Sequence, residues 1–127
     1  MKRAFWLPVS LLAVMLSASL LSGFFIGRDC DRWSAALEEA AVSASAGDWE
    51  SAERQLEAVS AAWDARQTYL HIVEVHEALN QTEALLRRVQ SFARQRDAAE
   101  FHASVQELLS ALRVLAEMES VNIKNIL

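Results

Sequence analysis

The stretch HEALN, which begins at His76, contains the residue types of a zinc protease site in almost the right spacing. Such a site needs two histidines four residues apart on one helix face and a glutamate that activates water. His76 and Glu77 fill the first two places, but Asn80 stands where the second histidine is required. His71 lies five residues before His76, about 140° away around a helix, and His102 lies on another element. The sequence therefore predicts no metal site, and it places His76 beside a packed helical stripe.

No other catalytic constellation occurs in the sequence. Cys30 is the single cysteine, so neither an intramolecular disulfide nor a Cys-x-x-Cys metal site can form. No serine lies in a glycine-flanked nucleophile elbow, and no glycine-rich phosphate loop is present. We therefore expect a protein that is not an enzyme and that has no catalytic residue, metal or cofactor.

Composition indicates one domain built from long helices. Residues 28–127 contain ten basic and seventeen acidic residues, a formal net charge of −7, which argues against a nucleic-acid partner. Gly47 is the only glycine in that range and proline is absent from it. With so few chain breakers and many Ala, Leu, Glu, Gln and Arg residues, helices are favoured over strands.

The first 28 residues have the pattern of a membrane anchor. Lys2 and Arg3 precede an uncharged run from Ala4 to Gly27. As a helix this run would reach about 36 Å, enough for a hydrocarbon core of about 30 Å. The basic start favours a cytoplasmic N-terminus. We therefore predict a single-pass protein of the cell membrane, with residues 29–127 forming a domain outside.

Two further features of this segment leave alternatives open. Ser17-Ala18-Ser19 offers small residues at the offsets of a signal-peptidase site, so a soluble secreted protein is the second interpretation. Gly23 and Gly27 form a GxxxG pattern, which lets two membrane helices approach closely. A homodimer through this segment is therefore a hypothesis, although glycines are also common near the ends of membrane helices.

Beyond the anchor, apolar residues recur in steps of three and four, which predicts helices near 31–46, 48–66, 69–95 and 98–118. Antiparallel hairpins of these helices would form a four-helix bundle. The stripes comprise Trp33, Leu37, Ala40 or Ala41 and Ala44; Trp49, Ala52, Leu56, Val59, Trp63, Leu70 and Val73, interrupted only by Arg66; Ile72, Val75, Leu79, Thr82, Leu86, Val89 and Ala93; and Phe101, Val105, Leu108, Leu112 and Leu115.

Helix-boundary signals accompany these stripes. Asp29 and Asp31 stand where the first helix would be capped, and Asp97 stands before the last. Gly47 provides a helix end and Asp48 a helix start. The stripe offsets from Asp97 repeat those from Asp48, 49 residues earlier, which indicates two related hairpins over 29–66 and 67–119.

Several residues have both a packing and a functional interpretation. Trp49 and Trp63 are two heptads apart and share a helix face with Leu56. Core packing is the more usual role of such a pair, while a small-ligand sensor with a pocket lined by Trp49, Trp63 and His76 is the alternative. The arginine-rich segment 87–96 is explained either by contact with anionic lipid or by the preference of cations for a helix C-terminus.

A family resemblance adds to this interpretation. The single N-terminal membrane segment, GDWESAERQLEAVSAAW at 47–63, the His76-Glu77 pair and the ending Asn125-Ile126-Leu127 resemble the uncharacterised bacterial family known as domain of unknown function 4363. The resemblance extends over essentially the whole chain, although Ala-Leu-Asn follows Glu77 where the family pattern has isoleucine and aspartate. It implies a membrane-tethered helical domain, chiefly of spore-forming, Gram-positive-type bacteria, with no assigned activity.

Together these features predict a membrane-anchored helical module without enzymatic activity. Its expected partners are the lipid bilayer and another membrane protein, which it would hold or modulate.

Overall fold

The structure is a computed structural model that describes residues 2–73 and 76–126, with side chains described for 4–18, 21, 27–67 and 77–118. In these residues there are four α-helices and no strand. The helices are α1 (Lys2–Ser45), α2 (Trp49–Val73), α3 (His76–Gln95) and α4 (Ala98–Ile126).

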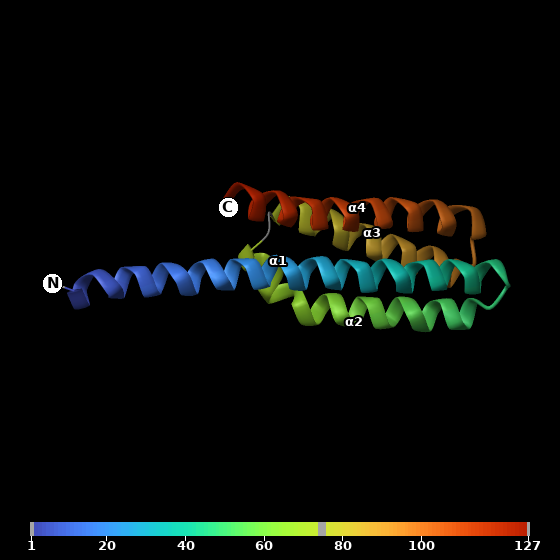
Figure 1. The fold of residues 1–127 in the computed structure, drawn as a ribbon. Helices are drawn as coiled ribbons and strands as arrows, with labels where there is room; N and C mark the ends of the chain where they lie inside the picture. Colours follow the sequence, from blue (N-terminus) through green and yellow to red (C-terminus); the bar gives the residue numbers. More distant parts are fainter. Residues whose placement is uncertain (1, 74–75, 127) are drawn as a thin grey trace.

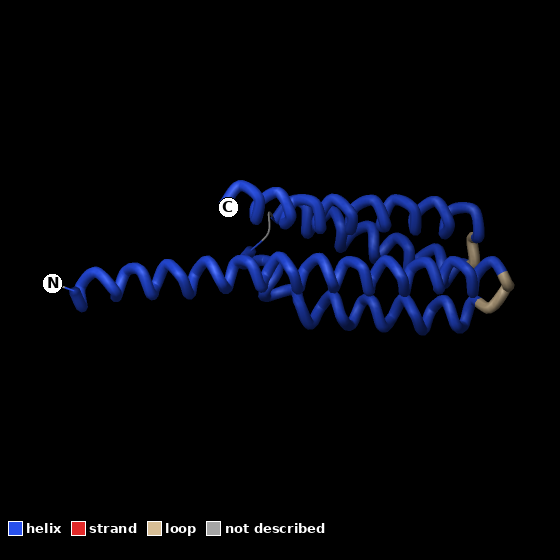
Figure 2. The backbone as a smooth tube through the Cα atoms, viewed as in Figure 1, coloured by secondary structure: helices blue, strands red, loops and turns tan. Residues whose placement is uncertain are grey.

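The four helices form an antiparallel bundle (Figure 1). α1 packs against α2 and α4, and α3 packs against α4 and α2, so neighbours in sequence are neighbours in space. The α1–α2 and α3–α4 turns lie at one end of the bundle, and the C-terminus lies at the other (Figure 2). α1 continues beyond that second end, well past the ends of α2 and α4 (Figure 1). The prediction of an all-α bundle of helical hairpins is confirmed.

The core consists of the apolar stripes of the four helices. Trp49 and Ala41 are only partly buried, and the stripe residues 70, 72, 73 and 75 lie outside the described side chains. The buried apolar residues are Cys30, Trp33, Leu37, Ala40 and Ala44 of α1; Ala52, Leu56, Val59 and Trp63 of α2; Leu79, Leu86, Val89 and Ala93 of α3; and Phe101, Val105, Leu108, Leu112 and Leu115 of α4. Thr82 is buried too and donates a hydrogen bond to the Ala78 carbonyl (2.8 Å).

The two hairpin turns have the same hydrogen-bond pattern. Gly47 has φ 81° and Arg96 has φ 55°, so each places one residue in the left-handed region. The next amide, of Asp48 or Asp97, donates to the carbonyl five residues earlier (2.8 and 3.1 Å). Each aspartate then accepts a hydrogen bond from the amide three residues later, at 3.1 and 3.2 Å. The predicted caps at Asp48 and Asp97 are therefore present, and the two turns repeat with the predicted spacing of 49 residues.

This equivalence predicts opposite effects of two substitutions. Gly47→Ala forces a side chain into the left-handed region and is expected to lower the free energy of unfolding by about 1 kcal/mol. Arg96→Gly removes the same strain and should raise it by a few tenths to about 1 kcal/mol. Urea denaturation of the full chain in mild detergent measures both. Arg94→Gly, in the last helical turn, is the control and should destabilise, so equal losses for Arg94→Gly and Arg96→Gly would contradict the assignment.

Four expected helix boundaries are wrong. The first helix does not begin at residue 31, because α1 runs without a break from Lys2 to Ser45. Gly27, at the end of the apolar run, does not interrupt the helix, so Asp29 and Asp31 have no free helix end to cap. α2 likewise continues past Gln67 to Val73, and the expected third helix begins later, at His76. α4 continues past residue 118 to Ile126, so the expected hairpin bounds of 29–66 and 67–119 are wrong as well.

A membrane-spanning helix is not found among the described residues, where no helical stretch has both the length and the apolar character required. The side chains of residues 19, 20 and 22–26 lie outside that described part.

Candidate functional site

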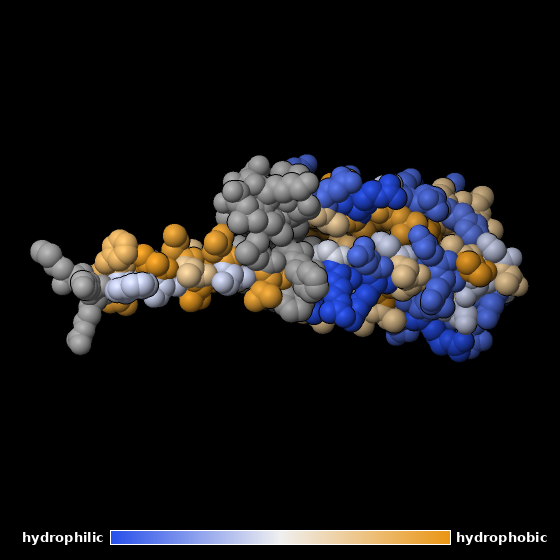
Figure 3. All heavy atoms as spheres, in the orientation of Figure 1, coloured by the Kyte–Doolittle hydropathy of each residue, from blue (hydrophilic) through white to orange (hydrophobic). Residues whose placement is uncertain are grey.

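The most exposed apolar surface of the described chain is the projecting part of α1. Every side chain from Ala4 to Ala18 is exposed, and Leu21 is exposed as well. Leu7 is 72% exposed and Leu12 is 70% exposed. Such exposed fractions are usual for charged residues on a protein surface and unusual for leucine. Figure 3 shows the contrast between this apolar rod and the mainly hydrophilic surface of the bundle. The other large exposed apolar residues here are Phe5, Trp6, Val9, Leu11, Val14, Met15 and Leu16.

The projecting part differs from an amphipathic helix because its apolar residues are not confined to one stripe. Leu11 and Leu12 are adjacent in sequence, so their side chains are about 100° apart around the helix. Both are exposed, as are Val14 and Met15. A helix that is apolar on all sides needs an apolar environment on all sides, which a single protein groove does not supply.

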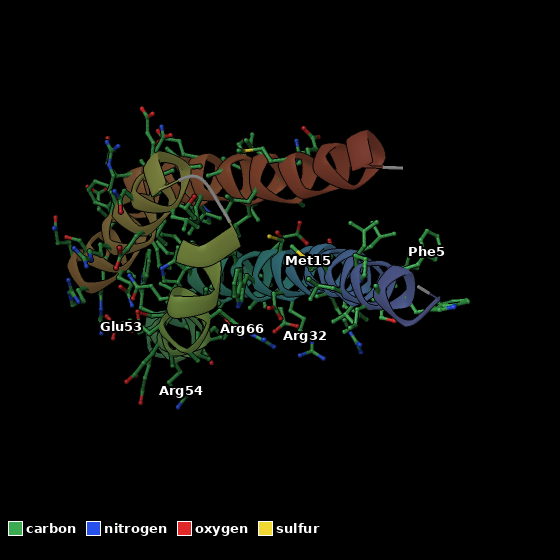
Figure 4. The ribbon with its side chains drawn as sticks, turned by 90° about the vertical axis from the view of Figure 1, so that its left-hand side faces the viewer. Phe5, Met15, Arg32, Glu53, Arg54 and Arg66 are labelled. Atoms are coloured by element: carbon green, nitrogen blue, oxygen red, sulfur yellow. The ribbon has the colours of Figure 1, made fainter. Side chains whose placement is uncertain are left out.

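An ion pair between α1 and α2 lies where α1 enters the described core. Arg66 Nε is 3.1 Å from Asp29 Oδ2, and the Asp29 side chain is only 15% exposed. Arg66 lies on the side of α2 that faces α1, whereas Arg54 points away from the bundle (Figure 4). Arg66, which interrupts the α2 stripe, therefore forms an ion pair with a neighbouring helix. Its partner is Asp29, the aspartate that we expected to cap a helix.

We expect this pair to contribute measurably to stability. Asp29→Asn and Arg66→Gln should each lower the free energy of unfolding by about 1 kcal/mol, and the double variant should lose no more than one of them. The control is Arg54→Gln, because Arg54 lies 3.9 Å from Glu50 and both side chains are largely exposed. A double-mutant cycle by urea denaturation measures the coupling. Strict additivity of the two single losses would show that the pair contributes nothing.

Trp49 and Trp63, which were predicted to share a helix face, lie in different surroundings. Trp63 is 3% exposed and makes an edge-on contact with Trp33, with ring centroids 5.5 Å apart. Among the described residues its buried indole Nε1 has no hydrogen-bond partner, an arrangement that normally costs about 1–3 kcal/mol. Trp49 is partly buried and packs edge-on against Phe101 near the turns, with centroids 5.2 Å apart. The pairing of Trp63 with Trp33 was not visible in the sequence.

Other predicted site residues are also placed by the structure. Leu56 is 1% exposed, in the core. The side chain of His76 and the surroundings of Gly23 lie outside the described part of the structure, although His76 is the first residue of α3. A Cβ built on Gly27 would meet no atom within 4 Å, so this side of α1 is open.

Shallow hollows on the described surface do not bring the predicted sensor residues together. One, of about 290 Å³, lies between α2 and α3 and is lined by Glu53, Leu56, Glu57, Gln90 and Arg94. Another, of about 250 Å³, lies between α1 and α4 and includes Cys30, Asp31 and Arg113. Neither lining contains Trp49 or Trp63. Among the side chains that the structure describes, no group of three or more His, Cys, Asp or Glu is placed to hold a metal ion.

The arginine-rich segment 87–96 lies towards the turn end of the bundle, opposite the projecting part of α1 (Figure 1). Arg87 pairs with Glu83 at 3.0 Å, and Arg88 reaches Glu107 of α4 at 3.5 Å. Arg94 lies in the last turn of α3. These positions favour the explanation that cations are stabilised near the C-terminus of a helix. They do not favour contact with a membrane that α1 would enter.

These features define a class of protein, an antiparallel four-helix bundle whose first helix projects as an exposed apolar rod. The chain belongs to the family described as domain of unknown function (DUF4363), whose model matches residues 21–126. The predicted family resemblance is thus confirmed. The match begins within α1, before the first core residue described, Cys30. No curated protein and no solved structure matches the chain.

Proposed function

We propose that this protein is a non-enzymatic helical module held at the cell membrane by the projecting part of α1. The bundle is the part that contacts another membrane protein. One observation supports the tether above all: residues 4–18 form a helix that is exposed and apolar on every side.

The free energy associated with this surface argues against a rod that stays in water. Burying a Val, Leu, Ile, Phe or Met side chain is worth roughly 1.5–3 kcal/mol. Ten large apolar side chains between Phe5 and Leu21 are exposed by 37–72%, so covering them is worth on the order of 10 kcal/mol. Lipid supplies such cover around the whole circumference. The uncharged sequence continues to Gly27, and Lys2 and Arg3 favour a cytoplasmic N-terminus with the bundle outside.

The bundle itself supports an interaction role rather than catalysis. Its core is filled by aliphatic and aromatic side chains, and the hollows described above have both charged and apolar residues in their linings. Ion pairs and helix caps account for several of the charged side chains on its surface. Pairing of two chains through Gly23 and Gly27 stays a prediction, and a Cβ built on Gly27 meets no described atom within 4 Å.

Membrane fractionation together with intact mass tests this proposal. Full-length protein expressed in a bacterial host should stay in the membrane after alkaline carbonate washing, with a mass that includes residues 1–28. A mature form beginning near residue 20 in the soluble fraction would instead show that the segment is a cleaved signal. Co-purification in mild detergent then addresses the partner: a second membrane protein should appear in a fixed ratio, and bare monomer in several native extracts would count against the interaction role.

A further inference from the structure

We propose that the end of the bundle from which α1 projects rests in the headgroup layer of the membrane, so that the tips of α2 and α4 contact lipid. This inference rests on the proposed function, namely that the projecting part of α1 lies in the bilayer. It adds a second membrane contact, made by the bundle itself, and it fixes the height of the bundle above the membrane.

The first argument is the absence of a spacer. α1 is one helix from Lys2 to Ser45, so the rod and the bundle share a single axis. A continuous helix rises 1.5 Å per residue and has almost no slack, unlike a flexible linker. The number of residues between the bilayer and the bundle therefore determines the distance between them.

The second argument is the register of the helices. Arg66 of α2 contacts Asp29 of α1, and α2 ends seven residues later at Val73. Because the two helices are antiparallel, Val73 lies level with about residue 22 of α1.

α4 gives a similar result. Ala116 lines the same hollow as Cys30, and α4 ends ten residues later at Ile126. The end of α4 is therefore level with about residue 20 of α1. The family match also begins at residue 21, as expected if the conserved unit is the bundle with its own part of α1.

The third argument is length. From Ala4 to about residue 20, α1 reaches about 25 Å, whereas the hydrocarbon core is about 30 Å thick. Tilting the helix would shorten its reach across the bilayer further. A straight helix is therefore about 5 Å too short for the core, and local thinning of the bilayer accommodates this mismatch. The bundle end then meets the interfacial layer without a gap.

The sequences at the two tips fit this layer. The last turns of α2 contain Tyr69, Leu70 and Ile72, and the last turns of α4 contain Ile123 and Lys124. Tyrosine and lysine combine an apolar body with a polar tip, which suits a membrane interface, and the aliphatic residues add apolar surface. The arginine-rich segment 87–96 is at the opposite end, so the contact does not depend on anionic lipid.

Site-specific fluorescence quenching of the full chain tests the inference. In a Cys30→Ser background that retains the helical circular dichroism of the wild type, single cysteines are introduced as Leu12→Cys, Val73→Cys, Ile126→Cys or Ala46→Cys. Each is labelled with an environment-sensitive fluorophore in phosphatidylcholine vesicles. Lipids spin-labelled at the headgroup should quench the labels at 73 and 126 several-fold more strongly than the label at 46. Position 46 is about 39 Å further along the α1 axis than residue 20.

The label at position 12 separates the two proposals. A deep acyl-chain spin label should quench it strongly. If it does, and the labels at 73 and 126 behave like the label at 46, the bundle stands off the membrane and this inference is wrong while the tether stands. If the label at 12 is not quenched, the proposed function fails and the inference fails with it. Two reporters on different helices keep the test valid if one variant does not fold.

Discussion

Leu56→Asp is expected to unfold the bundle. Leu56 is 1% exposed and lies in the middle of the α2 stripe, so the new carboxylate would be buried without a partner. Placing an unpaired charge in an apolar core costs several kcal/mol, a large part of the total stability of a domain of this size. Thermal unfolding followed by circular dichroism should therefore show a lost transition, or one far below that of the wild type.

The neighbouring position Ala58 supplies a matched control. Ala58 is exposed on the same helix, so Ala58→Asp introduces the same side chain at a cost of only about 0.7 kcal/mol in helix propensity. A large difference between the two variants isolates burial as the cause. If Leu56→Asp kept the melting temperature of Ala58→Asp, the four-helix register would be wrong.

The second large effect concerns the projecting part of α1. Leu11→Arg combined with Leu12→Arg places two charges near the middle of the apolar rod. Each arginine at the centre of a membrane helix costs about 2.5–3.5 kcal/mol on insertion scales, so the pair costs about 5–7 kcal/mol. We expect the protein to leave the carbonate-resistant membrane fraction. The melting transition of the bundle should be unchanged, because both leucines are exposed and outside the described core.

Two arginines placed on the bundle provide the control for this experiment. Ala35 and Val42 are exposed on α1 within the bundle, so Ala35→Arg with Val42→Arg adds the same charge without entering the rod. This control should remain in the membrane fraction. Unchanged membrane retention of the Leu11 and Leu12 variant would mean that the rod does not hold the protein in lipid, and the tether would have to be abandoned.

Much of the fold follows from local patterns in the sequence. The three-four spacing of Thr82, Leu86 and Val89 is a property of one helix, and it predicts their burial without knowledge of the neighbours. The turns at Gly47 and Asp97 depend on conformational preferences within a few residues, so they too were predictable. The family resemblance rested on short motifs, and the match over residues 21–126 confirms it.

Other features depend on contacts between segments that are distant in sequence. Asp29 is a residue type that commonly caps helices. Only the packing of α2 against α1 shows that it instead forms an ion pair with Arg66. The edge-on pairing of Trp63 with Trp33 likewise depends on how α1 and α2 pack.

The sequence by itself determined that the chain is helical, which faces of its helices are apolar, and where its hairpins turn. These properties arise from interactions within about one helical turn. Only the tertiary structure decided that α1 is one unbroken helix from the rod into the core, and that the arginine-rich segment lies at the end away from the rod. Such facts depend on the packing of all four helices together, because burial and ion pairing between helices select among local conformations that the sequence leaves nearly equal in free energy.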